Sequence, residues 1–142
     1  MTENFLNLAG TFMTIFLNNM RVLLFCITFA FFYGVGAIFI LTWNASIIGV
    51  VISNFAKNSI GNITAAISIA LARYLIHGIP EIIAYFMAGL AGGIISIAVV
   101  RHHFKSEQFR HILTDSLDLV IGAIMMLVIA GLLEIFVSPL IA

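Results

Sequence analysis

The stretch RYLIHGIPE, from Arg73 to Glu81, places three ionisable side chains, a glycine and a proline inside a long apolar sequence. Glycine is favoured just after the end of a helix, and proline is favoured in the first turn of the next one. Gly78 and Pro80 therefore predict that one helix stops at His77 and that another begins at Glu81. Because ionisable groups in apolar surroundings are costly and often functional, this stretch is also the leading candidate site.

The composition around this stretch is that of a membrane protein. Of the 142 residues, 63% are hydrophobic and 8% are charged, whereas about a quarter of the residues in a soluble domain are charged. The mean hydropathy is +1.20. Six Lys and Arg residues balance six Asp and Glu residues, so the excess of basic charge typical of nucleic-acid binding is absent. The sequence predicts an all-α transmembrane helical bundle in a lipid bilayer.

We divide the chain into an N-terminal amphipathic helix, residues 1–19, and a transmembrane helical domain, residues 20–142. Asn and Thr side chains recur three or four residues apart from Asn4 to Asn18, which is the period of a helix with a narrow polar stripe. Such a helix could lie in the membrane interface or pack against the other helices. It does not resemble a cleavable signal peptide, so we expect it to persist in the mature protein.

About five spans are expected in the transmembrane domain. A helix needs about 20 apolar residues to cross the hydrocarbon core, and residues 22–42 meet this length. Residues 45–56 are short for a full crossing, so they could form either a thin span or one arm of a re-entrant helical hairpin whose other arm is residues 63–76. The last two spans are expected at residues 81–100 and 117–137, the second after capping residues that include Asp115 and Asp118.

The basic residues predict an orientation in the cell membrane, because short cytoplasmic loops carry an excess of Lys and Arg. Placing Arg21, Lys57 and residues 101–110 inside gives a multi-pass protein with a cytoplasmic N-terminus. The His77–Glu81 turn and Glu134 then lie toward the outer face. The histidines of the basic segment could bind a metal, although a solvated loop that sets the topology is the preferred interpretation; they are His102, His103 and His111.

Gly89 and Gly93 form a G-x-x-x-G pattern in the span of residues 81–100. Small residues at this spacing let two helix backbones approach closely. The pattern therefore predicts helix packing, either within the chain or in a homodimer.

Arg73, His77, Glu81 and Glu134 are expected at one depth, which suggests that they act together. An ion pair of Arg73 with Glu81 or Glu134 would neutralise charges that are costly in a membrane, and this structural network is the preferred arrangement. Alternatively, His77, Glu81 and Glu134 could bind a divalent metal or relay a proton. A plain interfacial turn, with its polar residues among lipid headgroups, is also open.

Three motifs resemble the stage II sporulation protein M family of integral membrane proteins. The HGIPE turn, which ends at Glu81 and leads into a small-residue helix, is similar to the H-G-x-x-E turn of that family. Asn44 and Gly49 resemble its N-G-x-x-x-G segment, with Ala45 in place of the usual glycine. Glu134 resembles the glutamate near the end of the last family helix. The resemblance runs from about Asn18 onward.

The resemblance implies a polytopic fold and gives weight to Asn44, His77, Glu81 and Glu134. In sporulating bacteria the family is linked to engulfment of the forespore, in a membrane complex with peptidoglycan-degrading partners. It therefore implies partners among other membrane-complex proteins.

The sequence leaves three functions open. The first is a non-enzymatic scaffold or component of a membrane complex, which could be a homodimer. The second is a transporter or channel component that uses an outward-facing polar cluster. The third is a metal-dependent intramembrane hydrolase in which Glu81 or Glu134 is the general base beside His77. The preferred interpretation has no enzymatic activity, and a divalent metal is the one cofactor that these residues suggest.

Overall fold

The computed structural model describes residues 2–34, 63–101 and 106–141, with isolated positions between 35 and 62. Three long helices account for most of this part of the chain: α1 (Thr2–Tyr33), α3 (Ile63–Arg101) and α4 (Glu107–Phe136). A short 3-10 helix, η1 (Ser138–Ile141), follows α4. Each of the three α-helices is long and apolar enough to cross a membrane. The prediction of an all-helical membrane protein is confirmed.

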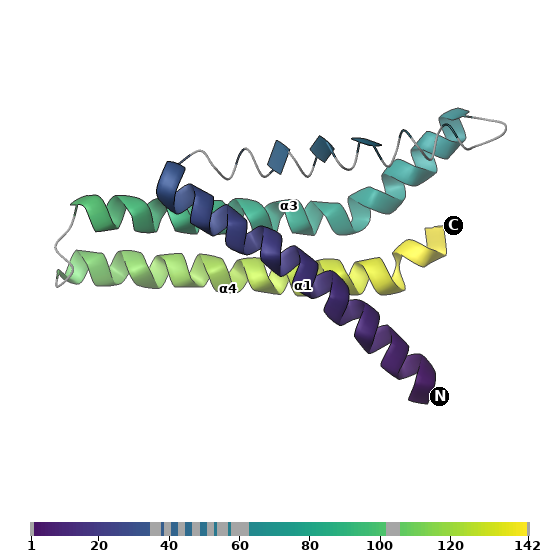
Figure 1. Ribbon diagram of the computed structural model, residues 1–142, viewed down its shortest axis with the longest axis horizontal. Coiled ribbons are helices and arrows are strands. Elements are labelled where there is room, and N and C mark those ends of the chain that lie inside the picture. Colours follow the sequence, from purple (N-terminus) through teal and green to yellow (C-terminus); the bar gives the residue numbers. More distant parts are fainter. Residues whose placement is uncertain are drawn as a thin grey trace.

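The helices form an elongated bundle with α1 lying obliquely across it. Figure 1 shows α3 and α4 antiparallel and side by side, and these two helices share the largest interface. The end of α3 and the start of α4 lie at one end of the bundle, and both chain termini lie toward the other end (Figure 1). At the end that holds the termini, the first parts of α1 and α3 diverge from the bundle.

Small side chains fill the core where the three helices meet. The buried core combines Leu23 and Cys26 of α1 with residues of α3 and α4, namely Ala84, Tyr85, Ala88, Ala123 and Leu127. α1 approaches α3 closely at Gly92, where a Cβ atom would collide with the backbone carbonyl of Ile27. A Cβ atom on Gly131 of α4 would lie 2.9 Å from the Phe12 ring of α1. Alanine and glycine therefore allow the close helix packing that membrane proteins favour.

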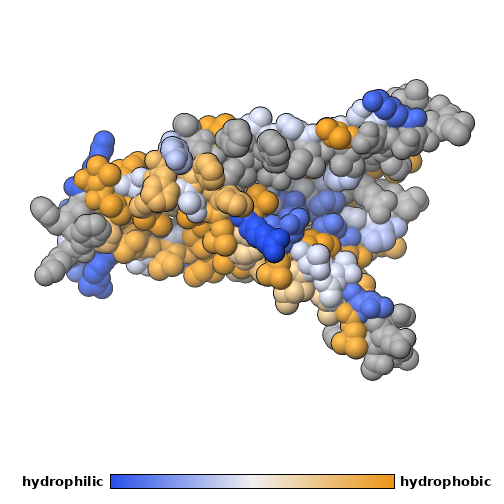
Figure 2. Space-filling model, viewed as in Figure 1, coloured by the Kyte–Doolittle hydropathy of each residue, from blue (hydrophilic) through white to orange (hydrophobic). Residues whose placement is uncertain are grey.

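The outer surface of the bundle is largely apolar. Large side chains such as Phe25, Leu90 and Leu132 are more than 40% exposed, and Figure 2 shows orange surface over much of the half that holds the α3–α4 connection. A soluble monomer exposes far smaller continuous apolar areas. This surface is suited to contact with lipid.

The first helix differs from the first span that the sequence predicted. α1 runs through residue 19 without a break and ends at Tyr33, so the first candidate span is Leu6–Tyr33 instead of residues 22–42. Gly34 follows with a φ of 68°, a conformation that suits glycine after a helix. The hydroxyls of Thr11 and Thr14 donate to carbonyls one turn earlier, which satisfies part of the polar stripe within the helix itself.

The predicted helix break at Gly78 and Pro80 is wrong, because both residues lie inside the continuous helix α3. Proline removes one backbone hydrogen bond, but membrane helices tolerate this where neighbouring helices and small local adjustments compensate. Figure 1 shows that α3 bends along its length, and a proline inside a helix is a common cause of a bend. Gly78 and Pro80 therefore lie within a helix that bends, not at a helix end.

The predicted count of about five spans is not supported, since three candidate spans occur among the described residues. Residues 63–76, expected as one arm of a re-entrant hairpin, form the first part of α3. The other arm, residues 45–56, falls mainly outside the described residues. We expected separate helices before and after residues 77–81, and their fusion into α3 removes one span from the count.

The last helix begins earlier than expected. α4 starts at Glu107, and the N-cap residue Ser106 accepts a hydrogen bond from the Phe109 backbone N–H at 3.2 Å. Asp115 and Asp118, expected as capping residues, are exposed within the helix. Because Ser106 with Glu107 in the first turn already stabilises the helix start, α4 extends about ten residues beyond the expected span.

The predicted cytoplasmic N-terminus stays a prediction, and so does the cytoplasmic side of residues 101–110. The predicted orientation placed both the N-terminus and the basic segment of residues 101–110 in the cytoplasm. Figure 1 shows the start of α1 and the end of α3 at opposite ends of the bundle, with the two helices running in the same direction.

Candidate functional site

Polar side chains from α1, α3, α4 and η1 lie close together, toward the end of the bundle that holds the chain termini. The Asn19 side chain of α1 donates a hydrogen bond to the Glu81 carboxylate of α3. One turn earlier in α3, His77 Nδ1 lies 3.2 Å from the Ser138 hydroxyl of η1. All four side chains are buried or half-buried. We call these four residues, together with Glu134, the polar network.

Glu134 of α4 brings a second carboxylate to this network. The carboxylates of Glu81 and Glu134 are close enough to repel each other electrostatically. Tyr85, one turn after Glu81 and 2% exposed, lies within the electrostatic reach of both. Two like charges in partly apolar surroundings disfavour each other, so the hydrogen bond from Asn19 to Glu81 offsets part of this repulsion.

The length of α3 between Glu81 and Arg101 indicates how far the polar network lies from the basic end of this helix. α3 advances 20 residues from Glu81 to Arg101, which corresponds to about 30 Å of helix and to about one hydrocarbon thickness. α4 has no charged residue between Asp118 and Glu134. The network and the α3–α4 connection are therefore spaced as the two faces of a bilayer are.

The structure places three of the predicted site residues in this network: His77, Glu81 and Glu134. Arg73 lies one turn before His77 in α3, but its side chain is outside what the structure describes, and so are the expected ion pairs with Glu81 or Glu134. Asn44 also lies outside the described residues. The functional role of this set stays a prediction.

The predicted packing glycines differ from each other. Gly89 is buried, whereas a Cβ atom on Gly93 would meet no atom of this chain within 4 Å. The neighbouring Gly92, which was not predicted, makes the close contact with α1. Within the chain, therefore, Gly92 takes the part that the pattern assigned to Gly93.

The geometry does not favour the predicted metal ligands. Among the described residues, no group of three His, Cys, Asp or Glu side chains is placed to hold a metal ion. His77 is directed to the Ser138 hydroxyl and Glu81 to the Asn19 carboxamide. His102 and His103 lie outside the described residues. His77 and Glu81, two of the three predicted metal ligands, thus contact other side chains of the protein.

The sequence interpretation missed Asn19, Ser138 and Tyr85. Asn19 falls outside the polar stripe that ends at Asn18, on the side of α1 that faces α3. A polar residue on the apolar side of a helix indicates a buried hydrogen bond, and that signal was available for Asn19. Ser138 lies just after the last expected span, residues 117–137.

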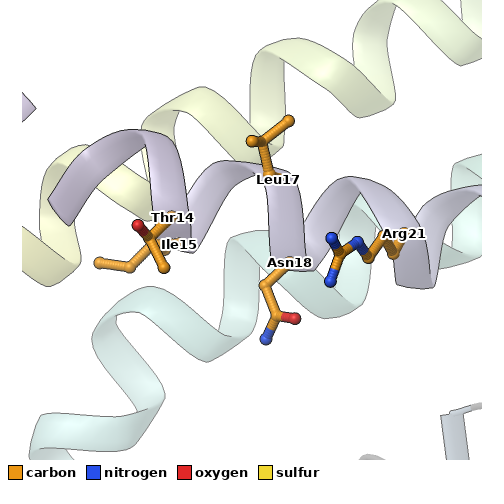
Figure 3. A pocket seen from close by; sticks show the side chains of 5 residues that line it. All are labelled: Thr14, Ile15, Leu17, Asn18 and Arg21. Carbon is orange, nitrogen blue, oxygen red and sulfur yellow. The ribbon is translucent and has the colours of Figure 1, made fainter. Parts of the chain in front are cut away.

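A separate pocket of about 430 Å³ opens on α1 and is lined by Thr14, Ile15, Leu17, Asn18 and Arg21. Figure 3 shows that all five side chains come from α1. The pocket is adjacent in sequence to Asn19 but contains none of the network residues that the structure describes.

The bundle of long apolar helices, joined by polar contacts between helices, defines a multi-pass α-helical membrane protein. The chain belongs to the Stage II sporulation protein M family, whose model matches residues 2–139. The match covers nearly the whole chain, including the part of α1 before Asn18 in which the motifs gave no resemblance. No curated protein and no solved structure matches the chain.

Proposed function

We propose that this protein is a non-enzymatic scaffold or component of a membrane complex. The observation that carries the proposal is the pairing of the polar network between helices: Asn19 with Glu81 and His77 with Ser138. These contacts join α1 to α3 and α3 to η1. Polar side chains that bond to each other across helices stabilise a fixed arrangement, which is what a scaffold requires.

The position of the pockets supports this interpretation. Transport and catalysis need reactive or charged groups that face a cavity or a substrate. Two pockets among the described residues are lined by other side chains, those from Thr14 to Arg21 and those from Glu107 to Thr114. The network residues instead face one another at helix crossings.

A scaffold also needs a surface for its neighbours, and α4 offers a long one. Its exposed large side chains recur three or four residues apart from Leu117 to Phe136, in the order Leu117, Ile121, Met125, Ile129, Leu132 and Phe136. This spacing makes one continuous apolar stripe. The stripe can contact lipid or the apolar helix of another membrane protein.

The basic residues favour one orientation of this bundle. We place the α3–α4 connection, with Arg101, Lys105 and Arg110, in the cytoplasm. The polar network and both termini then lie toward the outer side. A homodimer is part of the proposal, and Gly93 is the residue of the predicted pattern that is open to a second copy.

A transporter or channel component is the second candidate. It is favoured by the proximity of Glu81 and Glu134 and by Pro80 inside the same helix. Carboxylate pairs beside irregular helices occur in proton and ion paths. Under this alternative, one of the two carboxylates would carry the transported proton or cation.

Proteoliposomes distinguish the two candidates. The purified chain is reconstituted with a pH-sensitive dye inside, and a proton gradient or a potassium diffusion potential is imposed. A scaffold gives the same decay of the gradient for the wild type, for Glu81→Gln and for protein-free vesicles. A flux that requires the wild-type protein and is lost in Glu81→Gln would replace the scaffold proposal by transport. In native membranes, a scaffold should also migrate in a complex larger than the purified chain.

A further inference from the structure

Arg21 presents an exposed guanidinium on α1 beside the polar network. It forms no ion pair with any residue that the structure describes, where the one salt bridge joins Arg110 to Glu107 at 3.9 Å. The one acidic residue of α1 is Glu3, 18 residues away, or about 27 Å along the helix. The N–H groups of the Arg21 guanidinium are therefore available to bind a ligand from outside the bundle.

The pocket beside Arg21 combines hydrogen-bond donors with apolar walls. Thr14, Asn18 and Arg21 follow one another at helical spacing, so they share one side of α1 (Figure 3). Thr14 already donates its hydroxyl to the Gly10 carbonyl at 2.9 Å. The guanidinium of Arg21 and the carboxamide of Asn18 are therefore the donors that the pocket offers, and Ile15 and Leu17 supply apolar surface.

The pocket lies within the candidate span Leu6–Tyr33 of α1, at about the level of the polar network, and a cation inside a span is costly unless a partner neutralises it. Arg21 lies two residues after Asn19, whose side chain bonds to Glu81, and Glu81 is about 30 Å along α3 from Arg101. From residue 22 to residue 33, α1 contains Thr28 and Tyr33 as its only polar side chains. Figure 2 shows a hydrophilic patch within the apolar surface along α1.

We infer that Arg21 and Asn18 bind the phosphate of an anionic phospholipid in the leaflet opposite the α3–α4 connection. A guanidinium presents planar paired donors that suit phosphate oxygens. The described lining contains no carboxylate, so nothing there pairs with the cation of a zwitterionic headgroup. The volume of about 430 Å³ is in the range of ligand pockets. Lipid binding here does not depend on the scaffold role.

Native mass spectrometry of the full chain in neutral detergent tests the site. Micelles are doped with either phosphatidylglycerol or phosphatidylcholine, and the variants are Arg21→Gln, Arg21→Lys, Asn18→Ala and the control Arg110→Gln. We expect the wild type to prefer phosphatidylglycerol. Arg21→Gln should lower the affinity for phosphatidylglycerol about tenfold because it removes a charge-assisted contact. Arg21→Lys should keep part of the affinity, and Arg110→Gln should keep all of it.

The other outcomes each decide against the site. Equal affinity for the two lipids, or an unchanged affinity in Arg21→Gln, would overturn the inference. So would an Arg21-dependent change of oligomeric state without loss of lipid, which would assign the pocket to a second copy of the chain. Competition by millimolar inorganic phosphate would point to a free anion as the ligand. If Arg21→Gln does not fold, Arg21→Lys and Asn18→Ala must show reduced affinity for the inference to stand.

Discussion

The Asn19 side chain donates a hydrogen bond to the Glu81 carboxylate and so joins α1 to α3 across 62 positions of sequence. On the same helix, His77 contacts Ser138 of η1, which follows α4. The two contacts tie together segments from the start, middle and end of the described chain. These polar side chains therefore hold helices together, and this structural role is the basis of the scaffold proposal.

Gly92 and Gly93 provide a matched test of the packing between α1 and α3. Gly92→Ala would place a methyl group against the Ile27 backbone carbonyl. A backbone carbonyl, unlike the end of a flexible side chain, cannot rotate away from the new methyl group. We expect a loss of about 1–3 kcal/mol in the free energy of unfolding, because overpacking forces the helices apart. Gly93→Ala meets no atom of the chain within 4 Å and should leave the monomer as stable as the wild type.

Thermal unfolding of both variants in detergent provides the measurement. Equal stability of Gly92→Ala and Gly93→Ala would show that α1 does not cross α3 at this point. A loss of dimer in Gly93→Ala, without a loss of monomer stability, would support the proposed homodimer contact.

Cross-linking tests whether the first half of α1 packs on α4. A Cβ atom on Gly131 would lie 2.9 Å from the Phe12 ring. In a Cys26→Ala background, we therefore expect Phe12→Cys with Gly131→Cys to form a disulfide on mild oxidation. Leu8→Cys, at an exposed position one turn earlier, should cross-link poorly with Gly131→Cys and serves as the control.

Gel mobility with and without reductant measures this cross-link. No disulfide for the Phe12 pair, or an equal yield for the Leu8 pair, would indicate that residues 1–19 act as a separate segment. That result would favour the division predicted from the sequence.

Membrane topology can be read from single cysteines labelled in intact cells, again without Cys26. We expect Thr2→Cys and Leu140→Cys to react from one side of the membrane and Ser106→Cys to react from the other. The reason is that the two termini lie at one end of the bundle and the start of α4, with its N-cap residue Ser106, lies at the opposite end. An impermeant maleimide, added before or after permeabilisation, gives the measurement. Labelling of Thr2→Cys and Ser106→Cys from the same side would support the arrangement predicted from the sequence.

The class of the protein could be predicted from sequence because a helix that crosses a lipid bilayer needs a long run of apolar residues. Apolar length reports membrane crossing, and the motifs around His77 and Glu134 pointed to the family that the family model confirms. The grouping of Glu81 with Glu134 was also predictable, since both lie about one bilayer thickness from the basic connection.

The helix boundaries could not be predicted because local signals were outweighed by packing. Gly78 and Pro80 are typical of a helix break, yet they lie inside α3, which packs against both α1 and α4. Thr11 and Thr14 indicated a separate amphipathic helix, yet each hydroxyl bonds within α1. The partner of Glu81 depends on how α1 crosses α3, and the sequence contains no direct signal for that crossing.

A double-mutant cycle on Asn19 and Glu81 tests the structural role of the polar network most directly. Unfolding free energies are measured by steric trapping in bicelles for Asn19→Ala, Glu81→Ala and the double variant. Asn18→Ala with Glu81→Ala is the control pair, because Asn18 is exposed next to Asn19. We predict a coupling of about 1–3 kcal/mol for Asn19 and Glu81, in the range of hydrogen bonds to charged groups. Effects that add within about 0.5 kcal/mol, as expected for the control pair, would contradict a network that holds the helices together.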